Sequence, residues 1–374
     1  MATPAHGEEA HGIKGIGHLD IHGGGQVVVD GNYAYIGHMD PPQGTSIVDV
    51  SDPKRPKIVS QISLPSNTHS HKVRVHDNVM IVNNERYGRS QEPFVGGLRV
   101  FDIADRTKPK EIAFFRAGGT GVHRFDFDGH YAYLSPEMEG YVGNITLILD
   151  LSHPSQPVEV SQWWLPGQWT AGGETPTWQG RDHRTHHPLR LGNRLYVSLW
   201  MGGFAILDIS DLAHPKMLSQ FDWSPPYQAP THTALPVPFS ILNRKFLVVT
   251  DEAVSDTDPP AFLWVVDITD ETKPVPVANF QVPEDQFKGR GARFGAHQPR
   301  EKVDDTLIYV AWFSGGLRVV DIANPYRPAE VASYIPAPSG GQRVVQTNDL
   351  FKDDRGLIYI IDRYHGLEIL ELAL

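Results

Sequence analysis

The sequence predicts an all-β protein: a seven-bladed β-propeller with four-stranded blades, in which an N-terminal strand completes the last blade. Three observations lead to this fold class. An apolar motif ending in an acidic residue recurs along the chain, its period is close to fifty residues, and no segment shows competing helical periodicity. Such a period is typical of propeller blades, so the 374 residues form one ring rather than the two or three domains that length alone would indicate.

The recurring motif is predicted to be the third strand, C, of each blade. It reads TSIVDV at 45–50 and LRVVDI at 317–322. Successive acidic residues are spaced by 53, 48, 58, 59, 54 and 50 residues. They are Asp49, Asp102, Asp150, Asp208, Asp267, Asp321 and Glu371. Seven copies predict seven blades.

The remaining strands follow from the residues around each motif. A second apolar run, such as YAYIG at 33–37, precedes each copy, and an earlier segment, such as HKVRV at 71–75, precedes that run. We assign these segments to strands B and A, with A nearest the axis. A proline opens each outer strand, D, where a missing N–H is tolerated at a sheet edge. These prolines are Pro56, Pro109, Pro157, Pro215, Pro274 and Pro328.

The seventh blade lacks a D strand of its own, because the chain ends shortly after the last motif. The segment GIKGIGHLDI at 12–21 has the register of a D strand and precedes the first A strand, so we expect it to close the ring. The predicted organisation is a polar tail over residues 1–11 and a single propeller over residues 12–374.

The C-strand segments resemble a known family. SIVDV, RVFDI, LILDL, AILDI, WVVDI and RVVDI are similar to the strand for which the LVIVD-repeat proteins are named. The resemblance extends over residues 12–374 and implies a seven-bladed propeller. It implies no particular activity, because these repeats are structural and occur in proteins of varied role.

Composition excludes several functions. The net charge of −11 argues against nucleic-acid binding, which needs a basic surface, and no apolar run is long enough for a membrane span. The absence of cysteine excludes disulfides and thiolate metal sites. The first residues do not read as a signal peptide, so we expect a cytoplasmic location, with a removed leader and a periplasmic or extracellular location left open. The expected partner is a small-molecule substrate; oligomeric state is left open.

Histidine is unusually frequent, at 18 residues. When the blades are aligned on the turn after strand A, several histidines fall near one position at the start of that strand, with Asn348 there in blade seven. Insertions blur the register in blades five and six, and His22 in blade one is displaced. The predicted metal ligands are His71, His123, His186, His232 and His297. The alignment favours His186 over His187, although strand alternation alone leaves that choice open.

Imidazoles that converge from separate blades suit a divalent transition metal ion, with iron or copper favoured and zinc or manganese possible. The alternative is a wet channel whose polar lining binds only water. Carboxylates in the B–C loops lie on the same predicted face. Glu85 and Glu139 are the preferred candidates to orient a ligand histidine or to transfer protons, and Asp251 and Glu252 occupy the same loop of blade five.

Two long D–A connections, at 165–187 and 282–299, are predicted to lie over the histidines. Trp169 and Trp178 in the first, together with His22 and Asn348, are the candidate substrate pocket. Arg290 and Arg293 in the second could meet an anionic group. The alternative for these loops is packing between blades.

The placement of the predicted site resembles that of propeller metalloenzymes such as the carotenoid oxygenases and the selenium-binding proteins, although their sequence signatures are absent. The resemblance implies a metal-dependent enzyme, foremost an oxidoreductase acting on a small molecule, with aromatic molecules among the candidates. A metal-dependent lyase or hydrolase is the second hypothesis, and a non-catalytic propeller that binds a partner is the third.

Overall fold

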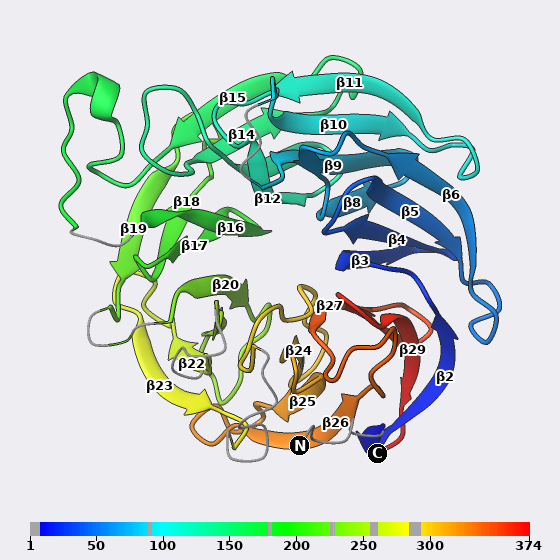
Figure 1. Cartoon of the computed structure of the whole chain (residues 1–374). Helices are drawn as coiled ribbons and strands as arrows, with labels where there is room; N and C mark the ends of the chain where they lie inside the picture. Colours follow the sequence, from blue (N-terminus) through cyan, green and yellow to red (C-terminus); the bar gives the residue numbers. More distant parts are fainter. Residues whose placement is uncertain are drawn as a thin grey trace.

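In the computed structural model, the chain forms a ring of antiparallel sheets around a central axis (Figure 1). The structure describes residues 8–88, 92–178, 182–224, 227, 229–254, 261–283 and 293–374. The all-β prediction is confirmed: the described helical structure is the 3-10 turn η1 (Thr170–Gly172). No helix in the described part of the chain has the length and apolar character needed to cross a bilayer.

The strand pairings of the described residues are consistent with seven blades, numbered here from the N-terminal side. Blade one comprises β3 (Gly24–Asp30), β4 (Tyr33–His38), β5 (Gln43–Asp49) and β6 (Lys57–Ser63). Blade two comprises β7 (Thr68–His69), β8 (Val73–His76), β9 (Val79–Arg86), β10 (Gly97–Asp102) and β11 (Lys110–Arg116). Blade three comprises β12 (Val122–Phe127), β13 (Tyr131–Pro136), β14 (Thr146–Asp150) and β15 (Val158–Trp163). Blade four comprises β16 (His183–Leu191), β17 (Arg194–Trp200), β18 (Phe204–Asp208) and β19 (Lys216–Phe221).

The second half of the ring continues this pattern. Blade five comprises β20 (Thr231–Pro236), β21 (Phe246–Asp251), β22 (Leu263–Asp267) and β23 (Val275–Phe280). Blade six contains β24 (Leu307–Ala311), β25 (Leu317–Asp321) and β26 (Ala329–Ile335), and blade seven contains β27 (Thr347–Lys352), β28 (Leu357–Asp362) and β29 (Gly366–Leu372). The inner segment of blade six is irregular, but it is tied to β24 by backbone hydrogen bonds such as Arg300 N–H to Tyr309 O at 2.8 Å.

The acidic residue that recurs at the end of the C strands has a local explanation. Asp49 Oδ1 accepts the N–H of Ser51 at 2.9 Å, and Asp208 Oδ1 accepts the N–H of Ser210 at 2.9 Å. An aspartate that binds the backbone two residues ahead begins a turn, so the motif ends the strand and reverses the chain. The repeat in the sequence is therefore a repeat of strand plus turn.

The N-terminal strand closes the ring as predicted. Strand β2 (Ile13–Leu19) pairs antiparallel with β29, from Ile13 opposite Leu372 to Leu19 opposite Leu367. The expected tail over residues 1–11 is corrected at its end, because β1 (Glu9–His11) pairs with the outer strand β26 of blade six. An open D-strand edge offers unpaired backbone groups, which explains why a polar segment adds to it.

The hydrophobic core lies between adjacent sheets. One buried cluster joins Val27 and Ile36 of blade one to Tyr359 and Ile369 of blade seven. Since each sheet is covered on both faces by its neighbours, the apolar side chains pack away from the axis. Polar side chains lie near the axis, at the start of the inner strands.

Candidate metal centre on the ring axis

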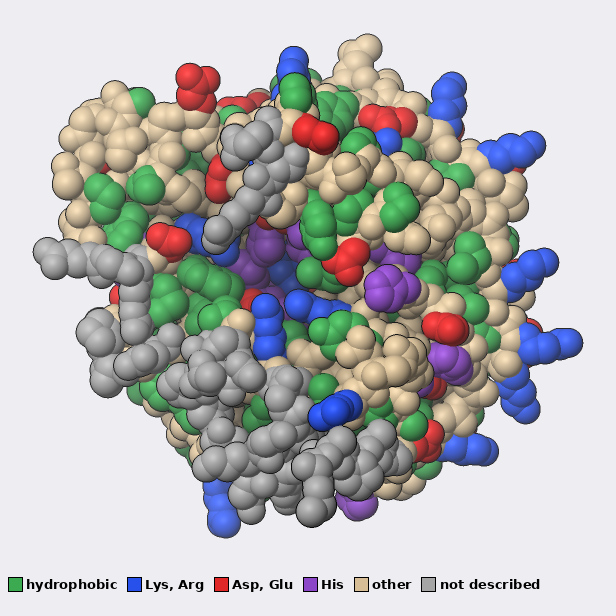
Figure 2. All heavy atoms as spheres, viewed as in Figure 1, with side chains coloured by type: hydrophobic (Ala, Val, Ile, Leu, Met, Phe, Trp, Pro, Cys, Tyr) green, Lys and Arg blue, Asp and Glu red, His purple; other side chains and the backbone are tan. Residues whose placement is uncertain are grey.

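The five predicted histidines form an arc at the centre of one face. Neighbouring ring centroids are 5.2 Å apart for His71 and His123, 4.8 Å for His123 and His186, 4.7 Å for His186 and His232, and 4.1 Å for His232 and His297. We call these residues the histidine arc. Figure 2 shows histidine side chains gathered in the central hollow of this face, with Lys and Arg side chains beside them.

Hydrogen bonds to backbone carbonyls determine the tautomers of two arc histidines. His186 Nδ1 lies 2.8 Å from the carbonyl oxygen of His232, and His297 Nδ1 lies 2.6 Å from that of Asn348. Because a carbonyl can only accept, both Nδ1 atoms carry the proton. In the neutral rings the Nε2 lone pairs are therefore free, which is the state of a metal-ligating imidazole.

A carboxylate holds His123 in the same way. Glu85, on β9, lies 2.9 Å from His123 Nδ1 and 2.9 Å from His69 Nε2. Burial opposes ionisation of Glu85, but the interactions with His123 and His69 outweigh it and lower the pKa of the carboxyl group. An ionised carboxylate only accepts, so His123 also directs an Nε2 lone pair away from it.

Two of these nitrogens face each other directly. His123 Nε2 and His186 Nε2 are 3.1 Å apart. Two lone pairs at this distance repel unless a proton or a metal ion lies between them. Burial, the largest cause, lowers the pKa of both histidines, which disfavours the proton. A metal ion bound at about 2.0–2.1 Å from each nitrogen would satisfy both.

Glu252 of blade five adds a carboxylate to the arc, beside His232 and His297. This buried residue follows β21, and its carboxylate oxygens lie 3.9 Å from His232 Nε2 and 3.9 Å from His297 Nε2. Ligand atoms of His186, His232 and Glu252 all lie within 4.8 Å of one another. Arg293 donates to Glu252 Oε1 at 3.2 Å and so holds the carboxylate in place. Because the Glu252 carboxylate faces the Nε2 atoms, it is placed to bind the same metal ion directly.

His71 is bonded differently from the other arc histidines. Asn83 accepts the Lys72 N–H through Oδ1 at 2.8 Å, which directs its Nδ2 donor to His71 Nδ1 at 3.1 Å. Since the Nδ1 lone pair is occupied, neutral His71 carries its proton on Nε2. This geometry suits a hydrogen-bond donor better than a ligand.

A charged layer lies directly beneath the arc. It includes the buried side chains of Lys72 and Arg124, each adjacent in sequence to an arc histidine. Burial is the largest cause of the lowered pKa values of His232 and His297, and the positive charge of Arg124 lowers them further. The arc is therefore kept neutral at physiological pH, as nitrogen ligands require.

The repeat itself is recognised by comparison with known sequences. A sequence profile described as the LVIVD repeat matches residues 24–63, 128–163, 191–222 and 302–335, which fall in blades one, three, four and six. The chain carries LVIVD repeats in a β-propeller fold.

Solved structures share the architecture of this LVIVD-repeat propeller. They include the computationally designed protein Ika8 (10% identity, 95% of this chain and 98% of that chain, TM-score 0.55) and Sqt1 of Saccharomyces cerevisiae (7%, 98% and 87%, 0.57). The WD40 β-propeller domain of Doa1 is also similar (8%, 96% and 97%, 0.61). At these identities the likeness shows the fold alone. No curated protein matches the sequence.

The propeller directs both adjacent histidines of blade four inward. The pairing of β16 with β17 shifts register between His183 and His187, and this irregularity breaks the alternation that would have sent one side chain outward. His186 joins the arc. His187 lies in the layer beneath, where Arg124 donates to its Nδ1 at 3.3 Å and its Nε2 lies 3.4 Å from Glu301.

The propeller places Glu139 away from the arc. Glu139 is exposed in the turn after β13, and among the described residues it makes no side-chain contact with the arc histidines. The chain turns back directly after the B strand here, whereas β9 runs on to Glu85. Glu85 and Glu139 have similar positions in the sequence, but only Glu85 reaches the arc, because β9 extends past it and β13 ends before Glu139.

The predicted pocket residues also divide. Trp169 is 41% exposed, packs against Trp164 at 5.7 Å, and lies in a loop that projects from the ring; Trp178 stacks on His183 at 4.8 Å. His22 is exposed at the rim.

Asn348 is buried in the arc layer, where its carbonyl holds His297 and its Oδ1 accepts from Arg363 Nε at 2.7 Å. Arg290 lies outside the described residues.

The aromatic rings beside the arc are ones that the sequence analysis did not single out. Trp200 packs on His186 at a centroid distance of 4.8 Å, and Phe313 stacks on His297 at 4.5 Å. Trp200 ends the B strand β17 and Phe313 follows the B strand β24, so a position at the end of a B strand could have indicated both. A polar residue also follows each arc histidine in the sequence, and these residues form the layer beneath the arc. They are Lys72, Arg124, His187, Thr233 and Gln298.

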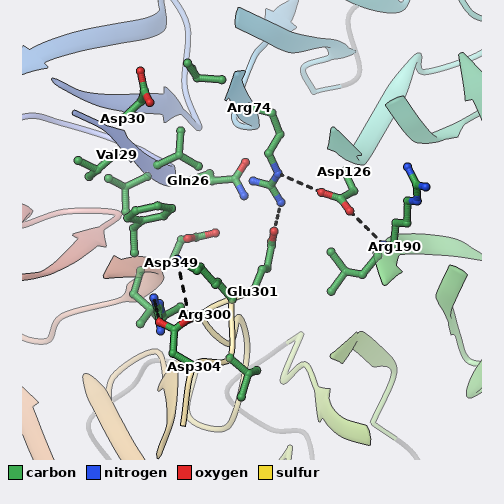
Figure 3. Close-up of a pocket in the computed structure, with 18 of the residues that line it drawn as sticks. Gln26, Val29, Asp30, Arg74, Asp126, Arg190, Arg300, Glu301, Asp304 and Asp349 are labelled. Carbon is green, nitrogen blue, oxygen red and sulfur yellow. Dashed lines mark hydrogen bonds and ion pairs between the residues drawn. The ribbon is translucent and has the colours of Figure 1, made fainter. Parts of the chain in front are cut away.

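The other end of the channel holds a cavity of about 560 Å³ (Figure 3). Its charged side chains are largely paired with each other. Arg74 contacts Glu301 and lies 3.8 Å from Asp126, and Arg300 donates to Asp304 at 2.7 Å. These residues come from the distal ends of the inner strands, so the channel has a histidine end and a mixed-charge end.

Proposed function

We propose that the histidine arc binds one transition metal ion and that the protein is a metal-dependent enzyme, foremost an oxidoreductase acting on a small molecule. One observation carries the proposal. Rings from separate blades are tied back through Nδ1, and their free Nε2 lone pairs face the axis, closest between His123 and His186 at 3.1 Å. An arrangement that only lined a wet channel would have no need of this common orientation.

The proposed ligands are His123, His186, His232, His297 and Glu252. Glu85 is a positioning residue that fixes the tautomer of His123. His71 remains in the arc as a hydrogen-bond donor. A shell of four neutral imidazoles and a carboxylate suits iron or copper, with zinc or manganese as alternatives. Such an ion, when bound, supplies redox or Lewis-acid chemistry at the open mouth of the ring.

The residues around the arc would suit a small anionic substrate, and an aromatic ring in that substrate could stack on them. Arg184 stacks over Trp200 at 4.7 Å, and Arg293 and Arg363 lie over Phe313 at 5.5 and 5.6 Å. Three guanidinium groups thus lie beside the arc with aromatic rings beneath them. Guanidinium groups bind carboxylates and stack on planar rings, so this wall would orient an anionic group of the substrate.

Metal analysis of the purified protein tests the proposal. Protein made in iron- and copper-replete medium is expected to contain about one equivalent of a transition metal, measured by inductively coupled plasma mass spectrometry. His123→Ala should lose it, because His123 Nε2 lies 3.1 Å from His186 Nε2, where the ion is proposed to bind. His130→Ala is the matched control, since His130 is an exposed histidine of the same blade. Equal metal content in both variants, or metal-free wild-type protein, would refute the proposal.

A metal-dependent lyase or hydrolase is the second candidate, and Glu252 favours it. Its carboxylate faces two Nε2 atoms at 3.9 Å, beyond hydrogen-bond distance, so it could serve as a general base beside the ion rather than as a ligand. Oxygen consumption with a panel of small aromatic carboxylates separates the two. Turnover that proceeds without oxygen would assign the lyase or hydrolase reaction.

A further inference from the structure

We propose a second metal site, formed by His18, His365 and Glu368, at the seam where the N-terminal strand β2 closes blade seven against β29. The site would take a divalent ion such as Zn²⁺ and would join the two ends of the chain. It lies on the closing blade, apart from the histidine arc, and does not depend on the function proposed for the arc.

The geometry brings three ligand atoms to one point. Glu368 Oε1 lies 3.0 Å from His18 Nδ1 and 2.6 Å from His365 Nε2, and the two imidazole rings are 4.6 Å apart. All three ligand atoms lie within 4.8 Å of one another. Two imidazoles and one carboxylate are a common zinc-binding set, in which water completes the coordination.

The surroundings of the cluster also resemble a metal site. His365 Nδ1 lies 3.0 Å from the Ser339 hydroxyl, so the second nitrogen has its own partner. His365 Nε2 donates to Glu368 at 2.6 Å, and an ion that binds there would take the place of that proton. Glu368 is buried, whereas the side chain of His18 is 39% exposed. An ion could therefore enter from the His18 side and find a preorganised carboxylate and imidazole beneath.

Blade one provides an internal comparison. By strand register, Ser46 on its C strand and Gln61 on its D strand occupy the places of Glu368 and His18, and a histidine, His38 at the end of its B strand, contacts the C-strand residue as His365 does in blade seven. His38 Nε2 lies 2.8 Å from Ser46 Oγ, and Gln61 donates to the same oxygen at 2.9 Å.

The two D strands pair in the same register, with Gln61 opposite Ser46 and His18 opposite Glu368. Blade one thus makes this bridge with hydrogen bonds alone. Blade seven replaces the hydroxyl and the amide with a carboxylate and an imidazole, and its outer strand β2 lies far in the chain from β27, β28 and β29. A strand that is not covalently continuous with its blade gains most from a cross-link, because ion binding to the closed ring stabilises it by mass action.

Zinc titration with matched variants tests the inference. His18→Gln copies the blade-one residue and keeps a hydrogen bond to Glu368. His365→Gln is a second variant in case the first misfolds, and His153→Gln, at an exposed turn histidine, is the control. Zn²⁺ stoichiometry is measured at pH 8 by equilibrium dialysis, together with hydrogen–deuterium exchange of peptides that cover 12–21.

Wild type and His153→Gln are expected to bind one more equivalent of Zn²⁺ than either seam variant, and Zn²⁺ should slow exchange in 12–21 at least tenfold only when the seam is intact. Repeating the titration in the His123→Ala background removes the contribution of the arc, so failure of one site is distinguishable from failure of the other. Equal stoichiometry in all variants, or exchange in 12–21 that does not respond to Zn²⁺, would overturn the proposal and leave a hydrogen-bonded clasp.

Discussion

The substitution Glu85→Gln tests the logic of the arc most directly. Glu85 accepts from His123 Nδ1 at 2.9 and 3.1 Å and from His69 Nε2 at 2.9 Å. A glutamine has one acceptor oxygen and one NH₂ donor, so it can satisfy one of these histidines but presents a donor to the other. It also removes the negative charge that strengthens the His123 ligand.

The expected cost is a 10–100-fold loss of metal affinity, or about 1.4–2.7 kcal/mol, which is the usual effect of removing the carboxylate behind a ligand histidine. The dissociation constant is measured by competition with a chromophoric chelator at pH 7.5, and the melting temperature confirms that the ring stays folded. Glu139→Gln is the control, since this exposed carboxylate lies away from the arc.

Equal metal affinity in Glu85→Gln and the wild type would show that His123 does not depend on Glu85 as a ligand partner. A loss in Glu139→Gln of the same size as in Glu85→Gln would show instead that the effect is one of surface charge. Either result refutes the reasoning from geometry.

Three further predictions concern other parts of the ring. Glu252→Gln should weaken metal binding at least tenfold if the Glu252 carboxylate is a ligand. If the carboxylate is instead a general base, metal affinity should stay intact and turnover should be abolished. Chelator competition and activity, measured on the same preparation, distinguish the two roles. Burial lowers the pKa of His38 from 6.5 to about 4. The unfolded chain alone binds this proton between those values, so acidification through that window should cost about 3 kcal/mol, and scanning calorimetry should find a flatter pH dependence in His38→Gln. In Gly37→Ala, the added Cβ would lie 2.6 Å from the backbone of His71; this variant should distort the arc and lower both the melting temperature and the metal content, and unchanged values would contradict the close contact.

Much of the fold could be predicted because its determinants are local. The aspartate that ends a C strand accepts a hydrogen bond from the backbone N–H two residues later. The proline before the next strand lacks an N–H, so that strand must lie at the edge of its sheet. Such features recur wherever the blade recurs, so a period is visible in the sequence. The closing strand was predictable for the same reason: its register matches that of an ordinary outer strand.

The histidine arc was predictable only as a set of positions. Equivalent positions in a ring face one axis, so the repeat alone predicts that His123 and His186 lie beside each other. The loops carry no such symmetry. Glu85 and Glu139 follow their B strands alike in sequence, but β9 runs on to present Glu85 to His123 while the chain turns away before Glu139.

The amino-acid sequence by itself determined the all-β class, the repeat and the closure by the N-terminal strand, since each rests on strand periodicity and turn chemistry within about fifty residues. Only the tertiary structure decided which atoms converge. The direction of His187 depends on a register irregularity, the tautomer of His186 on a carbonyl from the next blade, and the position of Glu252 on Arg293, which holds its carboxylate near His232 and His297. These are contacts between residues far apart in the chain, and their distances follow from how the blades pack rather than from any local pattern.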